Sequence, residues 1–230
     1  MSAAIAALKS PEGSAARGDA EALRQARLRL LHLVLGHRSE AVDPMPGLEP
    51  SVQDFWSREL FGLSTLMDTE LIADPSRRTA EAKRNLSEAV SRLGDGAPLE
   101  VRNLAFVTEV QSWGVYRPEE KCEFAPEQKV LLYAEVENLL SKDTPRGHLT
   151  AWRCSYQIFD SRGQRVAEHE FAANEEYCQN VRRDFFIGCE FYLPKRVYPG
   201  KHTLQLTVAD VISQKIGQSS IDFTIRSPGE

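Results

Sequence analysis

The feature that most constrains this fold is a change of hydrophobic periodicity at residues 94–98, Gly-Asp-Gly-Ala-Pro. Before this segment, apolar residues recur every three or four positions, which is typical of amphipathic helices. After it, apolar and polar residues alternate, which is typical of half-buried strands. The chain is therefore predicted to be an α+β multidomain protein, with a flexible tail over 1–18, a helical segment over 19–94 and a β-sandwich over 99–227.

About three helices are expected in the helical segment. The first starts with Asp19 as its N-cap and stops at Gly36, a residue suited to a helix C-terminus. The second starts near Ser51 in a capping-box arrangement and has the strongest apolar face in the chain. The third starts at Asp74, which is followed by proline, and stops at Gly94. Such helices form an antiparallel bundle or a fragment of a helical repeat, whose apolar faces need covering.

About seven short strands are expected in the second segment. They are predicted near residues 103–108, 130–137, 149–160, 165–171, 185–193, 201–210 and 219–225. Turn signals separate them, and the segments 111–128 and 174–183 are expected to be loops. Strands at this spacing, with no helical pattern between them, favour an antiparallel sandwich over a parallel sheet.

The four cysteines do not indicate a metal site or a disulfide scaffold. No two are spaced as CxxC, which argues against a zinc knuckle. Cys154 and Cys189 occupy alternating apolar positions of predicted strands, so we interpret them as small buried hydrophobes. A disulfide between the two sheets is the alternative.

Charge and hydropathy exclude some partners. A net charge of −5 gives no electrostatic reason to expect nucleic acid. No apolar run reaches the roughly 20 residues of a membrane helix. The apolar run Ala3–Leu8 is short and has no basic residue before it, unlike a secretory signal. A cytoplasmic location is expected, or export if the true N-terminus lies upstream.

No motif predicts catalysis, a metal or a cofactor, so the chain is not expected to be an enzyme. The run 62–66, Gly-Leu-Ser-Thr-Leu, lacks the second glycine of a nucleophile elbow and falls within a predicted helix. None of the five histidines has a partner at a metal-binding spacing on one helix or strand face. Calcium bound by Asp160 or Asp210 with loop carbonyls is a minor alternative, because no dense Asp pattern accompanies either residue.

The last predicted hairpin resembles the closing hairpin of immunoglobulin-like and fibronectin-type modules in bacterial proteins. The residues that carry this resemblance are Pro199, Gly200, Lys201, Thr203, Leu204, Asp210, Phe223, Thr224 and Ile225. The sequence departs from the pattern at His202, where an aromatic residue is usual. More broadly, residues 20–226 resemble a family of uncharacterised bacterial proteins of the planctomycete type. The sequence segments that carry this resemblance are 101–106, 132–138, 156–160 and 182–185. The resemblance implies an immunoglobulin-like sandwich and brings no activity with it.

Aromatic and basic residues in predicted loops are the candidate partner-binding residues. They are Trp113, Tyr116, Tyr177, Arg182 and Arg183. Binding residues concentrate in loops on rigid scaffolds, and Trp, Tyr and Arg dominate interface energetics. Alternatively, Trp113 and Tyr116 fold back and plug the end of the sandwich.

These observations favour a non-enzymatic module that binds or assembles with a protein partner. A carbohydrate or cell-envelope binding module, with Trp113, Tyr116 and Trp152 stacking on sugar rings, is the alternative. A hydrolase with an unrecognised site ranks third.

Overall fold

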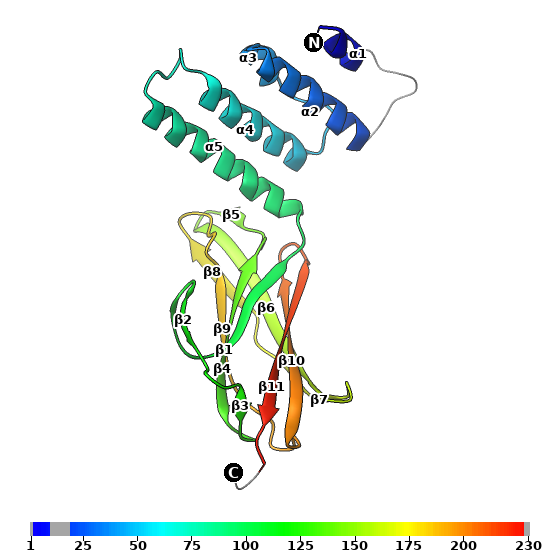
Figure 1. Ribbon diagram of the computed structural model, residues 1–230, viewed down its shortest axis with the longest axis vertical. Helices are drawn as coiled ribbons and strands as arrows, with labels where there is room; N and C mark the ends of the chain where they lie inside the picture. The colour runs from blue at the N-terminus through cyan, green and yellow to red at the C-terminus, as the bar shows by residue number, and fades with distance from the viewer. Residues whose placement is uncertain (1, 10–18, 228–230) are drawn as a thin grey trace. The chain divides into compact units, whose positions relative to one another are not determined.

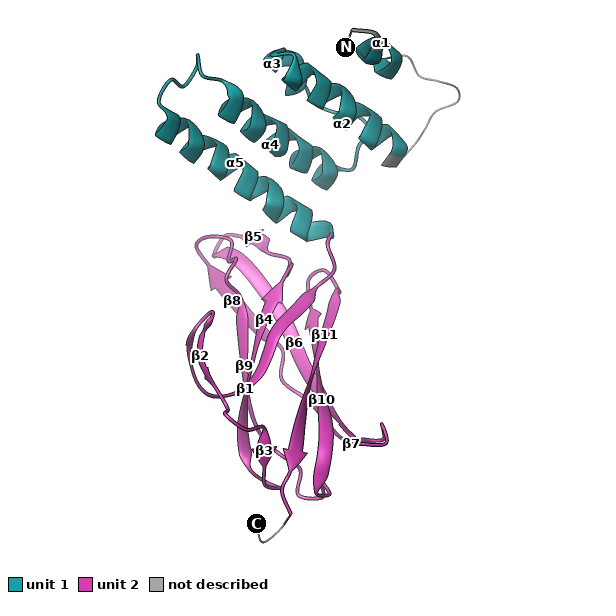
Figure 2. Cartoon of the chain, in the orientation of Figure 1, with its two compact units in different colours: residues 1–96 teal, residues 97–230 magenta. Residues whose placement is uncertain are grey.

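The protein consists of two compact units, residues 1–96 and 97–230 (Figure 2). The computed structural model describes residues 2–9 and 19–227 (Figure 1). The boundary between the units falls inside the segment 94–98, where the hydrophobic periodicity changes.

The described part of the first unit contains five helices, where about three were expected. They are α1 (Ser2–Lys9), α2 (Asp19–Val34), α3 (Arg38–Ala41), α4 (Pro50–Met67) and α5 (Pro75–Gly96). Helix α1 lies within the predicted tail, in an alanine-rich run with high helix propensity. Helix α3 is a single turn, too short to produce a periodic pattern. The rest of the predicted tail, residues 10–18, lies outside the described residues.

Two of the predicted helix ends form as expected. The Asp74 carboxylate accepts a hydrogen bond from the backbone N–H of Arg77 at 2.9 Å and caps α5. Gly36 follows α2 with a φ of +75°, the left-handed conformation that ends many helices. The capping box predicted at Ser51 is wrong, because α4 starts at Pro50 without a side-chain cap.

Helices α4 and α5 pack closely where Gly62 of α4 meets Leu86 of α5. Gly62 of α4 leaves so little space that an added Cβ would lie 2.9 Å from the side chain of Leu86 on α5. Ala82 and Ala89 are the fully buried residues of α5. Ser64 is buried within α4, and its hydroxyl donates to the carbonyl of Phe61 in the same helix.

The second unit consists of two sheets, with eleven strands among the described residues. The strands are β1 (Glu100–Ser112), β2 (Val115–Pro118), β3 (Glu123–Phe124), β4 (Lys129–Glu137), β5 (Lys142–Thr144), β6 (Gly147–Asp160), β7 (Arg165–Glu170), β8 (Asn174–Cys178), β9 (Phe186–Tyr192), β10 (Gly200–Asp210) and β11 (Ile216–Ile225). The four-stranded sheet has the order β2-β1-β4-β9. The seven-stranded sheet has the order β3-β11-β10-β6-β5, and β7 and β8 also pair with β6. The pairing of β3 with β11 is parallel, and the other described pairings are antiparallel.

Four strands were not expected from the sequence. β2 and β3 lie in the predicted loop 111–128, β8 starts the predicted loop 174–183, and β5 is a three-residue strand beside β6. These strands have between two and five residues, too few for alternation to reveal them.

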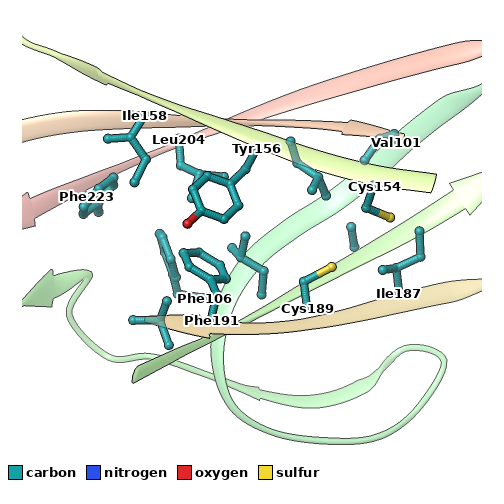
Figure 3. Packing of buried hydrophobic residues seen from close by; sticks show 14 of the residues in the cluster. Val101, Phe106, Cys154, Tyr156, Ile158, Ile187, Cys189, Phe191, Leu204 and Phe223 are labelled. Atoms are coloured by element: carbon teal, nitrogen blue, oxygen red, sulfur yellow. The ribbon is translucent and has the colours of Figure 1, made fainter. Parts of the chain in front are cut away.

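The core lies between the two sheets (Figure 3). On β10 apolar and polar residues alternate along the sequence, which predicts that His202, Leu204, Leu206 and Val208 share the inward face; all four are buried. On β1 the alternation is interrupted at Asn103, whose φ is +50° and where the register with β4 shifts. This bulge lets both Val101 and Phe106 enter the core, although they are five residues apart.

No helix in the described part of the chain is long and apolar enough to cross a membrane.

Candidate binding surface

The segment predicted as a loop around Trp113 is a hairpin, with β1 and β2 joined by a turn at Trp113 and Gly114. Gly114 has a φ of +69°, which favours glycine. Its backbone N–H donates a hydrogen bond to the hydroxyl of Tyr133 at 2.7 Å. Tyr133 lies on the face of β4 opposite the core residues Leu132 and Ala134. The hairpin tip is therefore fastened to the outer face of the four-stranded sheet.

A buried polar pair lies under this hairpin. The Tyr133 hydroxyl donates to Glu135 at 2.9 Å, and the amide of Asn103 donates to the other carboxylate oxygen at 2.8 Å. Tyr133 is fully buried and Glu135 is 8% exposed. Burial and the neighbouring Glu135 carboxylate raise the pKa of Tyr133 to about 12. Because both carboxylate oxygens have donors, we interpret the pair as an anchor for the hairpin.

A series of aromatic rings extends across this outer face. Tyr116 stacks on Tyr133 at a centroid distance of 4.2 Å, and Tyr133 stacks on Phe186 of β9 at 5.7 Å. The guanidinium of Arg182 lies 5.6 Å from the centre of the Phe186 ring. Trp113 stays outside this series and is 47% exposed. Of the two predicted loop aromatics, Tyr116 thus packs on the sheet while Trp113 keeps half its surface in solvent.

The remaining predicted site residues have different surroundings. Arg182 pairs with Glu176 at 2.6 Å, so it joins β8 to the aromatic series. The ring of Tyr177 is covered by the guanidinium of Arg146 at 3.9 Å. Arg183 is exposed and makes no hydrogen bond or ion pair with any described residue. Tyr177 and Arg182 are thus engaged within the chain, whereas Arg183 is available to a partner.

The two aspartates considered for calcium cap turns instead. Asp210 is 1% exposed, and its oxygens accept hydrogen bonds from the backbone N–H groups of Leu140, Ile212 and Ser213. Asp160 accepts from two backbone N–H groups of its own turn. Oxygens surrounded by N–H donors are poor ligands for a cation, since calcium needs clustered oxygens.

His202 takes the place of the aromatic residue expected in the closing hairpin. Its ring is buried 5.6 Å from that of Phe223, and its Nδ1 lies 3.0 Å from the carbonyl oxygen of Gly200. Its Nε2 has no hydrogen-bond partner among the described residues. A groove of about 540 Å³ passes beside it, lined by side chains of both charges, including Lys201 and Asp222. Mixed charge in an open groove does not select a substrate class.

One group of side chains in the described residues has ligand atoms close enough for a metal ion. His32, His37 and Glu40 bring theirs within 4.8 Å of one another. The sequence predicted no such pair, because residues five apart do not share a helix face. The sequence feature that could have revealed the pair is Gly36, which ends the helix between the two histidines.

No protein-family model and no curated protein matches the chain. Among solved structures, alkylpurine DNA glycosylase AlkC of Pseudomonas fluorescens is 14% identical with a TM-score of 0.34, over 75% of this chain and 48% of that chain. The C-terminal domain of Wzt is 12% identical with a TM-score of 0.36, over 57% of this chain and 75% of that domain. An immunoglobulin-like protein of Pseudomonas aeruginosa is 14% identical with a TM-score of 0.31, over 56% of this chain and 98% of that protein.

The chain spans about half the length of the glycosylase that it matches. All three TM-scores are below 0.5, so none of these similarities supports an assignment of function.

Proposed function

We propose that this chain is a non-enzymatic protein-binding or assembly module whose second unit is an immunoglobulin-like sandwich. The observation that carries the proposal is the exposure of Trp113 and Val115, at 47% and 49%, on a hairpin fastened to the sheet through Gly114 and Tyr133. A large aromatic side chain on a rigid support is the usual anchor of a protein interface. Because the hairpin is already ordered, binding loses little conformational entropy.

The proposed interface is the hairpin surface, defined as Trp113, Val115, Tyr116, Phe186 and Arg183. It combines aromatic residues with Arg183, which is exposed three residues before Phe186 in the sequence. Aromatic residues and arginine are enriched in interfaces between proteins. Gly188 lies opposite Tyr133 in the pairing of β4 with β9. A side chain added at Gly188 would meet nothing within 4 Å, so this position opens to solvent beside the aromatic series.

The test compares partner capture by the wild type and two variants. Trp113→Ala removes the anchor, and Gly188→Arg places a bulky charge on the surface without a clash inside the chain. Both are expected to weaken binding of the captured protein and to raise its Kd at least tenfold. Tyr198→Ala is the matched control, since Tyr198 is an 80% exposed aromatic residue that precedes β10, outside the hairpin. Equal capture by all four proteins, or no capture by the wild type, would contradict the proposal.

A carbohydrate-binding role has less support from the positions of its three candidate rings. Trp152 packs edge-on against Phe185 at 4.6 Å and is only partly exposed, and Tyr116 is stacked on Tyr133. Only Trp113 then offers a free ring face, whereas stacking platforms for sugars usually need more than one. Binding on a glycan array that is lost in Trp113→Ala would favour this alternative over the protein partner.

A further inference from the structure

Two histidines and a glutamate meet where α2 ends and α3 begins. His32 belongs to the last turn of α2, His37 precedes α3 and Glu40 lies within α3. Gly36, with its φ of +75°, turns the chain between the two histidines. The backbone N–H of His37 then donates to the carbonyl of His32 at 2.9 Å. The turn thus brings together two imidazoles that a continuous helix would point in different directions.

The distance between the two imidazoles suits a shared ion. Nδ1 of His32 and Nδ1 of His37 are 3.4 Å apart, beyond the range of about 2.7–3.2 Å usual for N–H hydrogen bonds. Two nitrogens bound tetrahedrally to Zn²⁺ at about 2.0–2.1 Å lie about 3.3 Å apart. A Glu40 carboxylate oxygen completes the group within 4.8 Å. His37 and Glu40 are exposed, so small side-chain rotations can close the remaining distance.

Burial differs between the three ligands. His32 is 5% exposed and is held by its packing, whereas His37 and Glu40 are exposed. The site therefore combines one fixed imidazole with two ligands that solvent reaches. Neutral imidazole and ionised carboxylate are the forms that bind metals.

The ligand set selects the class of ion. Calcium and magnesium prefer sites built of oxygens, and copper(I) prefers sulfur. Two imidazoles and one carboxylate suit Zn²⁺ and its neighbours in the first transition row, and leave a fourth position open. The positive charges of Lys9 and Arg29, which also act on His32, oppose the binding of any cation here.

We propose that His32, His37 and Glu40 form a three-ligand site for a divalent first-row transition metal ion, for which Zn²⁺ is the reference. The ion would clamp α3 onto the end of α2 and present an open coordination position to solvent. The site lies in the helical unit and is independent of the hairpin surface.

The test is calorimetric titration of the full chain with Zn²⁺, after treatment with a chelator and under reducing conditions. One ion per chain is expected for the wild type. Glu40→Gln and His37→Ala should each weaken binding at least tenfold, and both change exposed residues, so far-UV circular dichroism should stay unchanged. Lys9→Gln should tighten binding, because it removes an opposing charge. His169→Ala, an exposed histidine on β7, is the matched control and should bind as the wild type does.

The absorption spectrum of the chain titrated with cobalt(II) identifies the ligand atoms. Nitrogen and oxygen ligands give only weak visible bands, whereas any of the four cysteines would add an intense charge-transfer band. No binding by the wild type, unchanged affinity in both ligand variants, or a thiolate band that persists in them would overturn the proposal.

Discussion

At the scale of single residues, Tyr133 determines where the Trp113 hairpin lies. Sequence alternation places Tyr133 and Glu135 on the outer face of β4, and the structure agrees. Both are nevertheless buried, because the hairpin covers them and the Tyr133 hydroxyl binds Gly114 on one side and Glu135 on the other. An outward position in a strand therefore does not imply exposure when a neighbouring hairpin folds over the sheet.

Removing this hydroxyl should destabilise the second unit. Tyr133→Phe leaves a carboxylate oxygen of Glu135 without its donor and should cost about 1–3 kcal/mol. Tyr156→Phe is the matched control, because Tyr156 is also buried but its hydroxyl makes no hydrogen bond among the described residues. Urea unfolding followed by tryptophan fluorescence measures both. Equal losses in the two variants would show that the anchor contributes nothing specific.

A second pair of residues lies inside the sandwich. Cys154 of β6 and Cys189 of β9 are buried free thiols from opposite sheets, and both side chains enter the space between the sheets (Figure 3). The contact between the two thiols, together with burial, raises the pKa of Cys154, and the same contact lowers the pKa of Cys189. The structure has the two cysteines reduced, as the interpretation of buried hydrophobes expects. A bridge between the sheets, the alternative, would be the oxidised form of the same pair.

Refolding with oxidised glutathione should join this pair. The two thiols give two electrons and two protons to one glutathione disulfide, which leaves as two glutathione molecules. A bridge closing this loop should raise stability to urea by about 2–4 kcal/mol over the reduced protein. Cys122→Ala should retain the gain and Cys189→Ala should lose it. Peptide mapping that finds Cys122 or Cys178 in the bridge would refute the expectation.

At the scale of elements, the contact of α4 with α5 depends on Gly62. Gly62→Leu should destabilise the helical unit by about 1–3 kcal/mol, because the new side chain would overlap Leu86. Helix propensity alone predicts the opposite sign, since leucine favours a helix over glycine. Gly96→Ala is the control: Gly96 lies in α5, nothing lies within 4 Å of the added Cβ, and the change should be neutral or stabilising. Thermal unfolding at 222 nm distinguishes the two outcomes.

Elements with a long, regular pattern could be predicted from the sequence. The inward residues of β10, the Asp74 cap and the Gly36 stop follow from local rules and appear in the structure. The bulge at Asn103 could not be predicted, because asparagine tolerates a positive φ without requiring one, and the bulge interrupts the alternation of β1. Short strands such as β2 and β8 exist only through their pairing with β1 and β6, a tertiary effect.

The candidate sites were less predictable than the fold. Trp113 was proposed as a candidate from its residue type and turn context. Whether Tyr116 is exposed, in contrast, depends on its stacking partner Tyr133, 17 residues away. The pairing of His32 with His37 depends on one reversed turn between them. Periodicity describes a regular element, so it cannot reveal side chains that meet where an element ends.

At the scale of the whole molecule, each unit has its own stabilising contacts. The hydrophobic core cluster between the sheets lies entirely within residues 99–225, and the helices of the described chain all lie within the first unit. Cooperative unfolding requires that the loss of one part destabilise the rest. With separate cores, the two units should unfold in two transitions.

Two probes can separate these transitions in urea. Circular dichroism at 222 nm reports mainly the helices, and Trp56→Phe leaves Trp113 and Trp152 to report the second unit by fluorescence. The midpoints should differ, and each m-value should be that of a unit smaller than the whole chain. Gly62→Leu should then move only the dichroism curve and Tyr133→Phe only the fluorescence curve. Superimposable curves that both variants shift together would mean that the chain unfolds as one cooperative structure.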